Sequence, residues 1–139
     1  MTDTQARKRP LGVWIITVYF AVTVPFILYG LYLMLSGRAP MNDAQAVYVS
    51  NIDPLDITAT VMIGVSNIIG AVSLFKLRKA ALTFFGVSLA INIALTVWHV
   101  ATRGFVEVVG GAMPIVIGLV LLLSIIGYTA YLSKKQVLR

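Results

Sequence analysis

Residues 11–35 read LGVWIITVYFAVTVPFILYGLYLML, an apolar run without a charged side chain. The run follows the segment Arg7-Lys8-Arg9-Pro10 and ends before Ser36-Gly37-Arg38. About 20 apolar residues, rising 1.5 Å each along a helix, cross a hydrocarbon core of roughly 30 Å. The run therefore predicts a membrane-spanning helix.

Pro25 stands in the middle of this predicted helix. Proline removes one backbone hydrogen bond and crowds the preceding turn, so we expect a kink in the first helix. The basic residues before the run also fit a signal peptide. The run is longer than the usual 7–15 apolar residues of such peptides. The small residues Gly37 and Ala39, which would suit a cleavage site, are followed by Pro40. We therefore interpret the run as a retained helix.

Three further apolar runs follow, at about residues 55–75, 80–102 and 109–133. Asp53, Pro54 and Asp56 at the start of the second run are residues that suit a helix N-terminus. The sequence thus predicts an all-α integral membrane protein. Its four transmembrane helices form an antiparallel bundle, and residues 1–139 form a single transmembrane domain with one sizeable outer loop at 37–54.

Composition agrees with a membrane protein. Hydrophobic residues make up 59% of the chain, charged residues 12%, and the mean hydropathy is +0.92. Soluble domains are about half apolar and about a quarter charged, so most of this outer surface is expected to face lipid. The chain has no cysteine, which excludes disulfides and thiolate chemistry.

The basic residues predict the orientation. In a four-span chain, three groups fall on one side: residues 7–9, residues 76–79, and Lys134, Lys135 and Arg139. Only Arg38 and Arg103 fall on the other side. Basic residues near helix ends are retained in the cytoplasm, which predicts a multi-pass protein of the plasma or inner membrane with both termini cytoplasmic. The net charge of +6 is then a topology signal, and nucleic-acid binding is not expected.

Charged residues are missing from the central part of every predicted span. Ionisable groups within a membrane usually mark transport or catalysis. The sequence also has no paired carboxylates, no histidine cluster for a metal and no glycine-rich phosphate loop. We therefore predict no catalytic residues, no metal site and no cofactor, and an enzyme is disfavoured.

Polar residues nevertheless follow one face of the third predicted helix, at spacings of three or four. With an asparagine of the second helix they form a candidate polar seam: Asn67, Ser88, Asn92, Thr96, His99 and Arg103. The first interpretation is that such groups are ordinary hydrogen-bonding contacts between membrane helices. The second is a hydrated or ligand-binding path. In either case, we expect Asn67 to form a hydrogen bond with Ser88 or Asn92.

His99 is the only histidine and stands beside Trp98 near the outer end of its helix. The favoured interpretation is an anchor at the membrane interface. A role in pH sensing or as a general base is the alternative. Spacing along the chain places no second catalytic group in evident reach of His99.

Two functional hypotheses remain. In the first, the protein is a non-enzymatic helper or interaction subunit that packs in the bilayer against itself or against a larger membrane protein. In the second, it is an oligomeric carrier of a small solute or lipid that uses the seam between the second and third helices. The short loops and the missing charges favour the first.

Overall fold

The computed structural model describes residues 9–138, and every regular element in that part of the chain is a helix. Arg7, Lys8 and Arg139, which contribute to the predicted orientation, lie outside the described residues. The four long helices are α1 (Leu11–Leu35), α3 (Pro54–Phe75), α4 (Ala80–Arg103) and α6 (Ala112–Lys134); the short ones are α2 (Asp43–Ser50) and α5 (Phe105–Val108). All four long helices are long and apolar enough to cross a membrane. The prediction of an all-helical chain with four such helices is confirmed.

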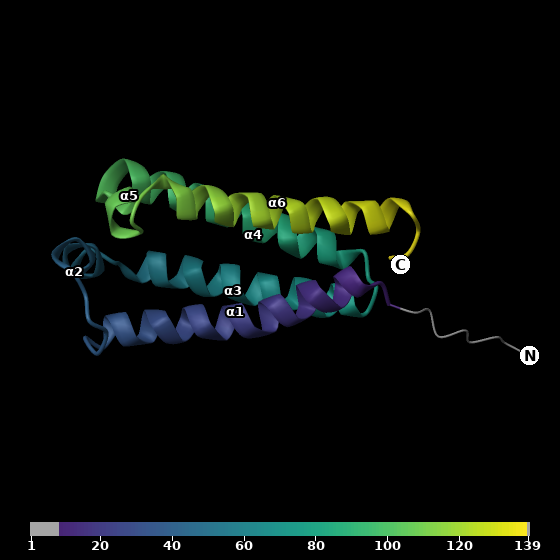
Figure 1. Cartoon of the computed structure of the whole chain (residues 1–139), viewed down its shortest axis with the longest axis horizontal. Coiled ribbons are helices and arrows are strands. Elements are labelled where there is room, and N and C mark those ends of the chain that lie inside the picture. The colour runs from purple at the N-terminus through teal and green to yellow at the C-terminus, as the bar shows by residue number, and fades with distance from the viewer. Residues whose placement is uncertain (1–8, 139) are drawn as a thin grey trace, which may run out of the picture.

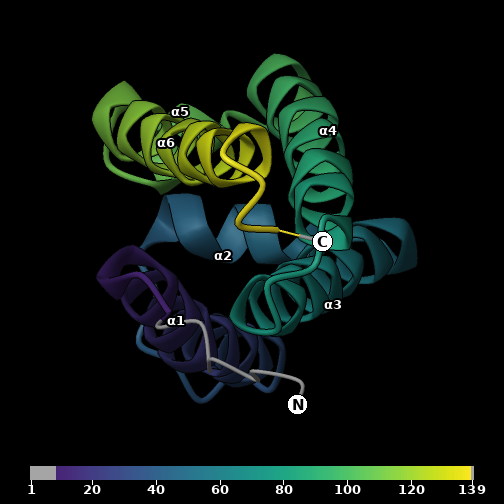
Figure 2. The same cartoon turned by 90° about the vertical axis from the view of Figure 1, so that its right-hand side faces the viewer.

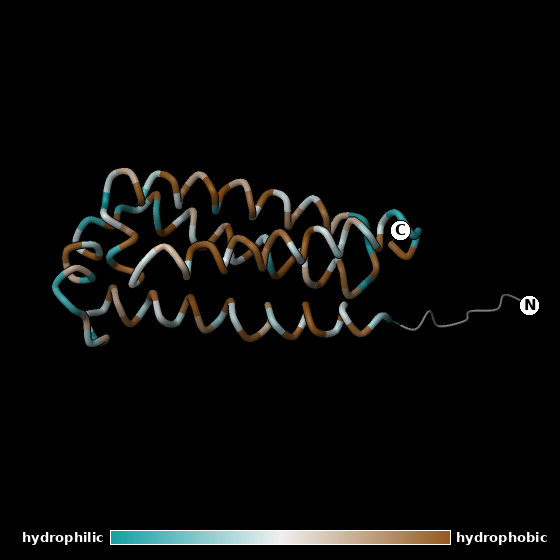
Figure 3. The backbone as a smooth tube through the Cα atoms, turned by 45° about the horizontal axis from the view of Figure 1, so that its top comes forward, coloured by the Kyte–Doolittle hydropathy of each residue, from teal (hydrophilic) through white to brown (hydrophobic). Residues whose placement is uncertain are grey.

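The long helices lie side by side along the longest axis of the molecule (Figure 1). The start of α1 and the end of α6 lie at one end, whereas α2 and α5 lie at the other, which we call the α2 end. Seen end-on, the helices follow the order α1, α3, α4, α6 around the molecule (Figure 2). Helix α3 packs against both α1 and α4, and α4 packs against α6. Hydrophilic residues gather at the two ends (Figure 3).

The helix boundaries follow from local chemistry. Helix α3 begins with a capping box, in which Asp53 and Asp56 each accept a hydrogen bond from the other's backbone N–H, both at 3.0 Å. Helix α4 ends at Arg103 and is followed by Gly104, whose φ of +61° suits glycine. Helix α6 begins at Ala112, three residues later than the expected start at 109, because α5 and a turn at Gly110 and Gly111 precede it.

The outer loop contains more structure than expected. Its middle forms α2, which also begins with a capping box: the Asn42 side chain accepts from the Gln45 backbone at 2.8 Å, and Gln45 accepts in return at 3.2 Å. Helix α1 runs without a break from Leu11 to Leu35 and includes Pro25. The kink at Pro25 stays a prediction.

The tightest packing lies away from the α2 end, in what we call the packed half, whose core includes Val13, Phe20, Ala71, Leu74, Ala81 and Phe85. The rings of Phe20 and Phe85 stack with centroids 5.4 Å apart. A Cβ on Gly70 would lie 2.8 Å from the Phe85 ring, and a Cβ on Gly12 would lie 2.6 Å from the Tyr128 ring. Glycine at these two positions therefore allows α3 to approach α4 and α1 to approach α6.

Candidate functional site

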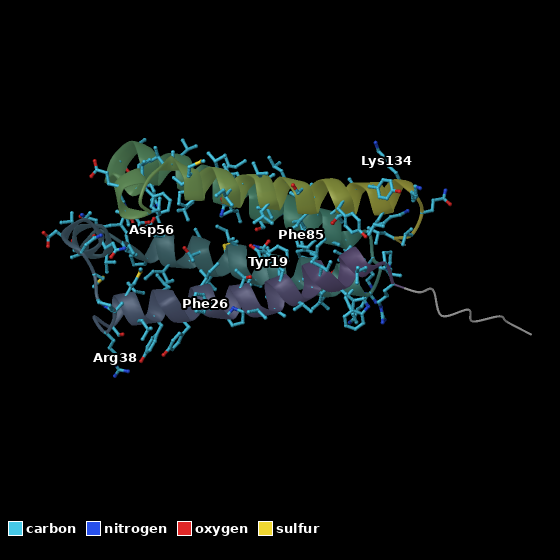
Figure 4. The ribbon with its side chains drawn as sticks, in the orientation of Figure 1. Tyr19, Phe26, Arg38, Asp56, Phe85 and Lys134 are labelled. Carbon is cyan, nitrogen blue, oxygen red and sulfur yellow. The ribbon has the colours of Figure 1, made fainter. Side chains whose placement is uncertain are left out.

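A polar cluster joins α2, α3 and α4 at the α2 end; its members are Tyr48, Asp53, Asp56, His99 and Arg103. Figure 4 shows Asp56 at this end and Lys134 at the opposite end. His99 Nε2 lies 3.0 Å from Asp56 Oδ1, and His99 Nδ1 lies 2.9 Å from the Tyr48 hydroxyl. A neutral imidazole satisfies both contacts by donating from Nε2 to the carboxylate and accepting at Nδ1 from the phenol.

Arg103 completes the cluster. Its guanidinium donates to Asp56 Oδ2 and, at 3.2 Å, to Asp53 Oδ2. Asp56 is 6% exposed and His99 4% exposed, so their polar groups are removed from solvent. A buried charge is costly unless it is paired and hydrogen-bonded. The Asp56 carboxylate meets that requirement because Arg103, His99 and the Asp53 backbone N–H all donate to it.

Tyr48 brings the outer loop into the cluster. Its ring lies with centroids 5.6 Å from both the His99 and the Phe105 rings. Burial raises the pKa of the Tyr48 phenol above its ordinary value, and the nearby Asp56 carboxylate raises it further. The phenol therefore stays protonated at neutral pH and can donate to His99.

The cluster corrects the sequence interpretation of His99. Spacing along the chain reveals no second catalytic group in reach of His99, but in the structure Asp56 and Tyr48 contact its two ring nitrogens. The sequence identifies Asp56 only as a residue that suits a helix start. Asp56 begins one span and His99 nears the end of the next, so both fall at the same end of an antiparallel pair. Their positions at the same end of consecutive helices could have predicted the contact between Asp56 and His99. The contact between Tyr48 and His99 depends on how α2 folds back and has no such signal in the sequence.

Two adjoining cavities lie between the long helices, next to the cluster. Their volumes are about 340 Å³ and about 330 Å³. We call them together the chamber, because they share the lining residues Val24, Ile27, Ile63, Asn67, Asn92, Thr96 and Phe105. His99 and Tyr48 line the larger cavity at the α2 end, and residues of α6 such as Gly118 line the smaller one. Pockets of a few hundred Å³ with mostly apolar walls and few polar groups are typical of small-molecule sites.

The structure separates the predicted seam into parts. Asn67, Asn92, Thr96 and His99 line the chamber, Arg103 belongs to the polar cluster, and Ser88 is fully buried away from both. The predicted hydrogen bond between Asn67 and Ser88 is absent, since neither Asn67 Oδ1 nor Ser88 Oγ has a hydrogen-bond partner among the described residues. Asn92 does not supply the partner of Asn67 Oδ1 either. Both asparagines instead line the same space.

The smaller cavity reaches the surface between α1 and α6. Ile27 of α1 and Leu121 of α6 both line it, and their exposed fractions are 52% and 42%. In the described part of the chain these two helices are not among the pairs that pack closely, although the Tyr128 ring reaches Gly12 in the packed half. The chamber is therefore accessible from the side of the molecule, through an apolar surface.

Fold and site together define a class: a helical membrane protein with four candidate spans around a side-opening chamber. Comparisons with protein families, with curated proteins and with solved structures find no match for this chain. Its activity has to be inferred from the chamber itself.

Proposed function

We propose that this chain is a carrier, or a binding protein, for a small amphipathic molecule that enters the chamber from the bilayer. The observation that supports this most is the chamber itself, whose two cavities of about 330 Å³ and 340 Å³ have mostly apolar walls with a few polar side chains such as Asn67, Asn92 and Thr96. Cavities of this size with few polar groups are typical of small-molecule sites. The exposed apolar residues beside the smaller cavity give a molecule in the bilayer access to it.

The alternative, a helper subunit held together by polar contacts between its helices, has less support. Such contacts stabilise a bundle when the polar groups bond across helices. Asn67 Oδ1 has no such bond, although α3 and α4 pack closely. A side-opening chamber is also unnecessary for a subunit that only packs against partners. The carrier hypothesis accounts for the chamber.

The proposal includes the predicted topology: an antiparallel bundle in a cell membrane, with both termini cytoplasmic and the α2 end outside. The polar cluster would then close the outer end of the chamber, and access would be lateral. In this cysteine-free chain, single cysteines at Asp43 and Lys79 test the orientation with an impermeant thiol reagent on intact cells. We expect labelling at position 43 alone; labelling of both positions from outside would reject the four-span topology.

Ligand binding is tested by reducing the chamber. Gly118 and Gly127 both lie in α6 with open space at their Cβ positions, but only Gly118 lines the chamber. The full chain in liposomes would be photolabelled with a long-chain alcohol that carries a diazirine. We expect Gly118→Leu to reduce labelling of chamber residues about tenfold and Gly127→Leu to leave it unchanged. Equal labelling of both variants, or labelling spread over the outer faces alone, would overturn the proposal.

Carrier activity requires a second measurement. Exchange of the alcohol between protein-containing liposomes and acceptor vesicles should be faster than in protein-free liposomes, and Gly118→Leu should abolish the increase. Labelling without faster exchange would favour a binding protein over a carrier. A foreign protein that co-purifies in constant ratio, together with an unlabelled chamber, would favour the helper hypothesis.

A further inference from the structure

We infer that the end of the molecule opposite the α2 end binds the head groups of anionic phospholipids. We call it the basic end, because six exposed cations lie at the start of α1, in the turn between α3 and α4, and at the end of α6: Arg9, Lys76, Arg78, Lys79, Lys134 and Lys135. Figure 4 shows Lys134 at this end. The inference rests on the four helices crossing a bilayer, as proposed above, and does not depend on a ligand in the chamber.

The charge of the basic end is not balanced by carboxylates of the described chain. The described carboxylates are Asp43, Asp53, Asp56 and Glu107, which belong to α2, to the start of α3 and to α5. Those elements lie at the α2 end (Figure 1), and so do the ion pairs between described residues. A basic surface of this kind attracts anions from its surroundings. Around the end of a membrane-spanning helix, those surroundings include lipid head groups.

Aromatic residues place these cations at the level of the head groups. Trp14 and Tyr131 are 48% and 51% exposed, and tryptophan and tyrosine are enriched where a bilayer meets water. The Trp14 ring lies 4.9 Å from the ring of Phe75, which directly precedes Lys76. Lys135 Nζ lies 5.0 Å from the centre of the Tyr131 ring. The cations therefore lie beside the rings that mark the interface, where the phosphates of lipids are found.

Arg9 is positioned to bind one of these phosphates. Its Nε donates to the Phe75 carbonyl at 3.0 Å, and its guanidinium carbon lies 4.1 Å from the centre of the Phe75 ring. These contacts hold the guanidinium against the end of α3, and its two terminal nitrogens form no hydrogen bond with the other described residues. Two parallel N–H groups of an arginine match two phosphate oxygens. Lys76 follows Phe75 in the chain and adds a second positive charge nearby.

Net charge decides which phospholipid is preferred. A zwitterionic head group carries the same phosphate together with an ammonium, which the surrounding lysines and arginines repel. An anionic head group has no such cation and gains from every positive charge near the surface. The basic end should therefore concentrate anionic lipid around itself, whereas the α2 end, which carries the carboxylates, should not.

The two tryptophans of the chain make the comparison within one molecule. Trp14 lies at the basic end and Trp98 lies near the α2 end, with exposed fractions of 48% and 57%. Trp98→Phe leaves Trp14 as the reporter, and Trp14→Phe leaves Trp98. Each full chain is placed in liposomes of phosphatidylcholine with a minor share of phosphatidylglycerol. Bromine, which quenches tryptophan fluorescence on contact, is carried either by the phosphatidylglycerol or by an equal amount of the phosphatidylcholine.

We expect brominated phosphatidylglycerol to reach Trp14 about threefold more often than brominated phosphatidylcholine, and the preference to shrink in high salt. Trp98 should be quenched equally by both lipids. Equal quenching of Trp14 by both lipids would overturn the inference, and the cations would then serve orientation alone. An equal preference for phosphatidylglycerol at both tryptophans would overturn it too, because the basic end would not be its source.

Charge variants locate the head group. Arg9→Gln combined with Lys76→Gln should reduce the preference measured at Trp14, whereas Arg38→Gln, an exposed arginine of the outer loop, should leave it unchanged. An unchanged preference in the double variant would overturn the placement of a phosphate at Arg9. If that variant fails to fold, the comparison of Trp14 with Trp98 still decides the inference. Failure of both brominated lipids to quench either tryptophan would reject the membrane-spanning arrangement, and this inference with it.

Discussion

The packed half and the half toward the α2 end, which we call the chamber half, are built from the same four helices. The helices contact one another closely in the packed half and leave cavities between them in the chamber half. In the packed half, Gly70 has no Cβ and the buried Phe85 ring occupies that space. Gly12 and Tyr128 bring α1 to α6 in the same manner. Toward the α2 end α1 and α6 separate, and Gly118 faces open space. Glycine thus allows close contact in one half and leaves room in the other.

Buried polar groups also differ in how far their hydrogen bonds are satisfied. The carboxylate of Asp56 has a donor on each oxygen, whereas the amide oxygen of Asn67 has none among the described residues. Both residues are buried on α3. Ser88 Oγ, which does not line the chamber, also has no partner among the described residues, so a missing hydrogen bond alone does not mark a ligand site. What distinguishes the polar cluster is that its buried charges are paired within the fold.

The largest effect is expected from breaking the polar cluster. Arg103→Met removes the cationic partner of Asp56 and leaves a buried carboxylate without its counter-charge. The free energy of unfolding, measured by titration with SDS in mixed micelles, should fall by roughly 3 kcal/mol. Arg38→Met changes an exposed arginine in the loop and is the matched control, with an expected change of less than about 0.5 kcal/mol.

A second variant sharpens this result. Adding Asp56→Asn to Arg103→Met removes the uncompensated charge, so part of the lost stability should return. If the single variant unfolds as the wild type does, the cluster is not the structural end of the bundle.

The two halves can be compared directly by placing the same side chain in each. At Gly70, the added atoms of valine would meet the buried Phe85 ring, whereas at Gly118 they would enter the chamber. The change in helix propensity is the same, so the difference reports packing. We expect Gly70→Val to be about 2 kcal/mol less stable than Gly118→Val in the same SDS titration. Equal stabilities would mean that the packed half is able to relax around the new side chain.

The sequence predicts the helices far better than it predicts the site. Hydropathy over some 20 residues is a strong, local signal, so the four long helices are found with their ends within three residues of the expected positions. The seam is also visible, because spacings of three and four place Asn92, Thr96 and His99 on one face. Distances between helices cannot be predicted from the spacing of residues along one helix. The amides of Asn67 and Asn92 could bond or could line a cavity, and only the separation of the helices decides between these outcomes.

The fold of the outer loop is equally hidden from sequence reasoning. From the sequence alone, residues 41–51 are predicted to be the least constrained part of the ordered chain apart from the termini, and this stays a prediction. In the structure α2 packs near α5, and Tyr48 contacts His99. A tyrosine in a polar loop carries no sign of its distant partner. The donor and acceptor of this bond lie 51 residues apart in the chain, beyond any local pattern.

A substitution at Asn67 is expected to raise the free energy of unfolding, whereas most substitutions in a core lower it. Asn67→Leu replaces a buried amide, whose oxygen is unpaired, by an apolar side chain with the same branching and the same number of heavy atoms, so the protein should gain about 1 kcal/mol in free energy of unfolding. Loss of stability on this substitution would show that the amide serves the fold, and would weaken the distinction between Asn67 and the polar cluster.

The smallest effect is expected at Tyr48, because its hydroxyl holds a short helix and not a long one. Tyr48→Phe keeps the ring against Phe105 and removes only the hydrogen bond to His99 Nδ1. We expect global stability to change by less than about 1 kcal/mol, while the amides of α2 exchange with solvent several-fold faster. Tyr29→Phe removes a hydroxyl from an exposed tyrosine of α1 and should change neither quantity. Hydrogen exchange measured by mass spectrometry on peptides from residues 41–51 would detect the difference. Unchanged exchange in Tyr48→Phe would mean that α2 is held mainly by its apolar contacts, and the polar cluster would then join α3 to α4 alone.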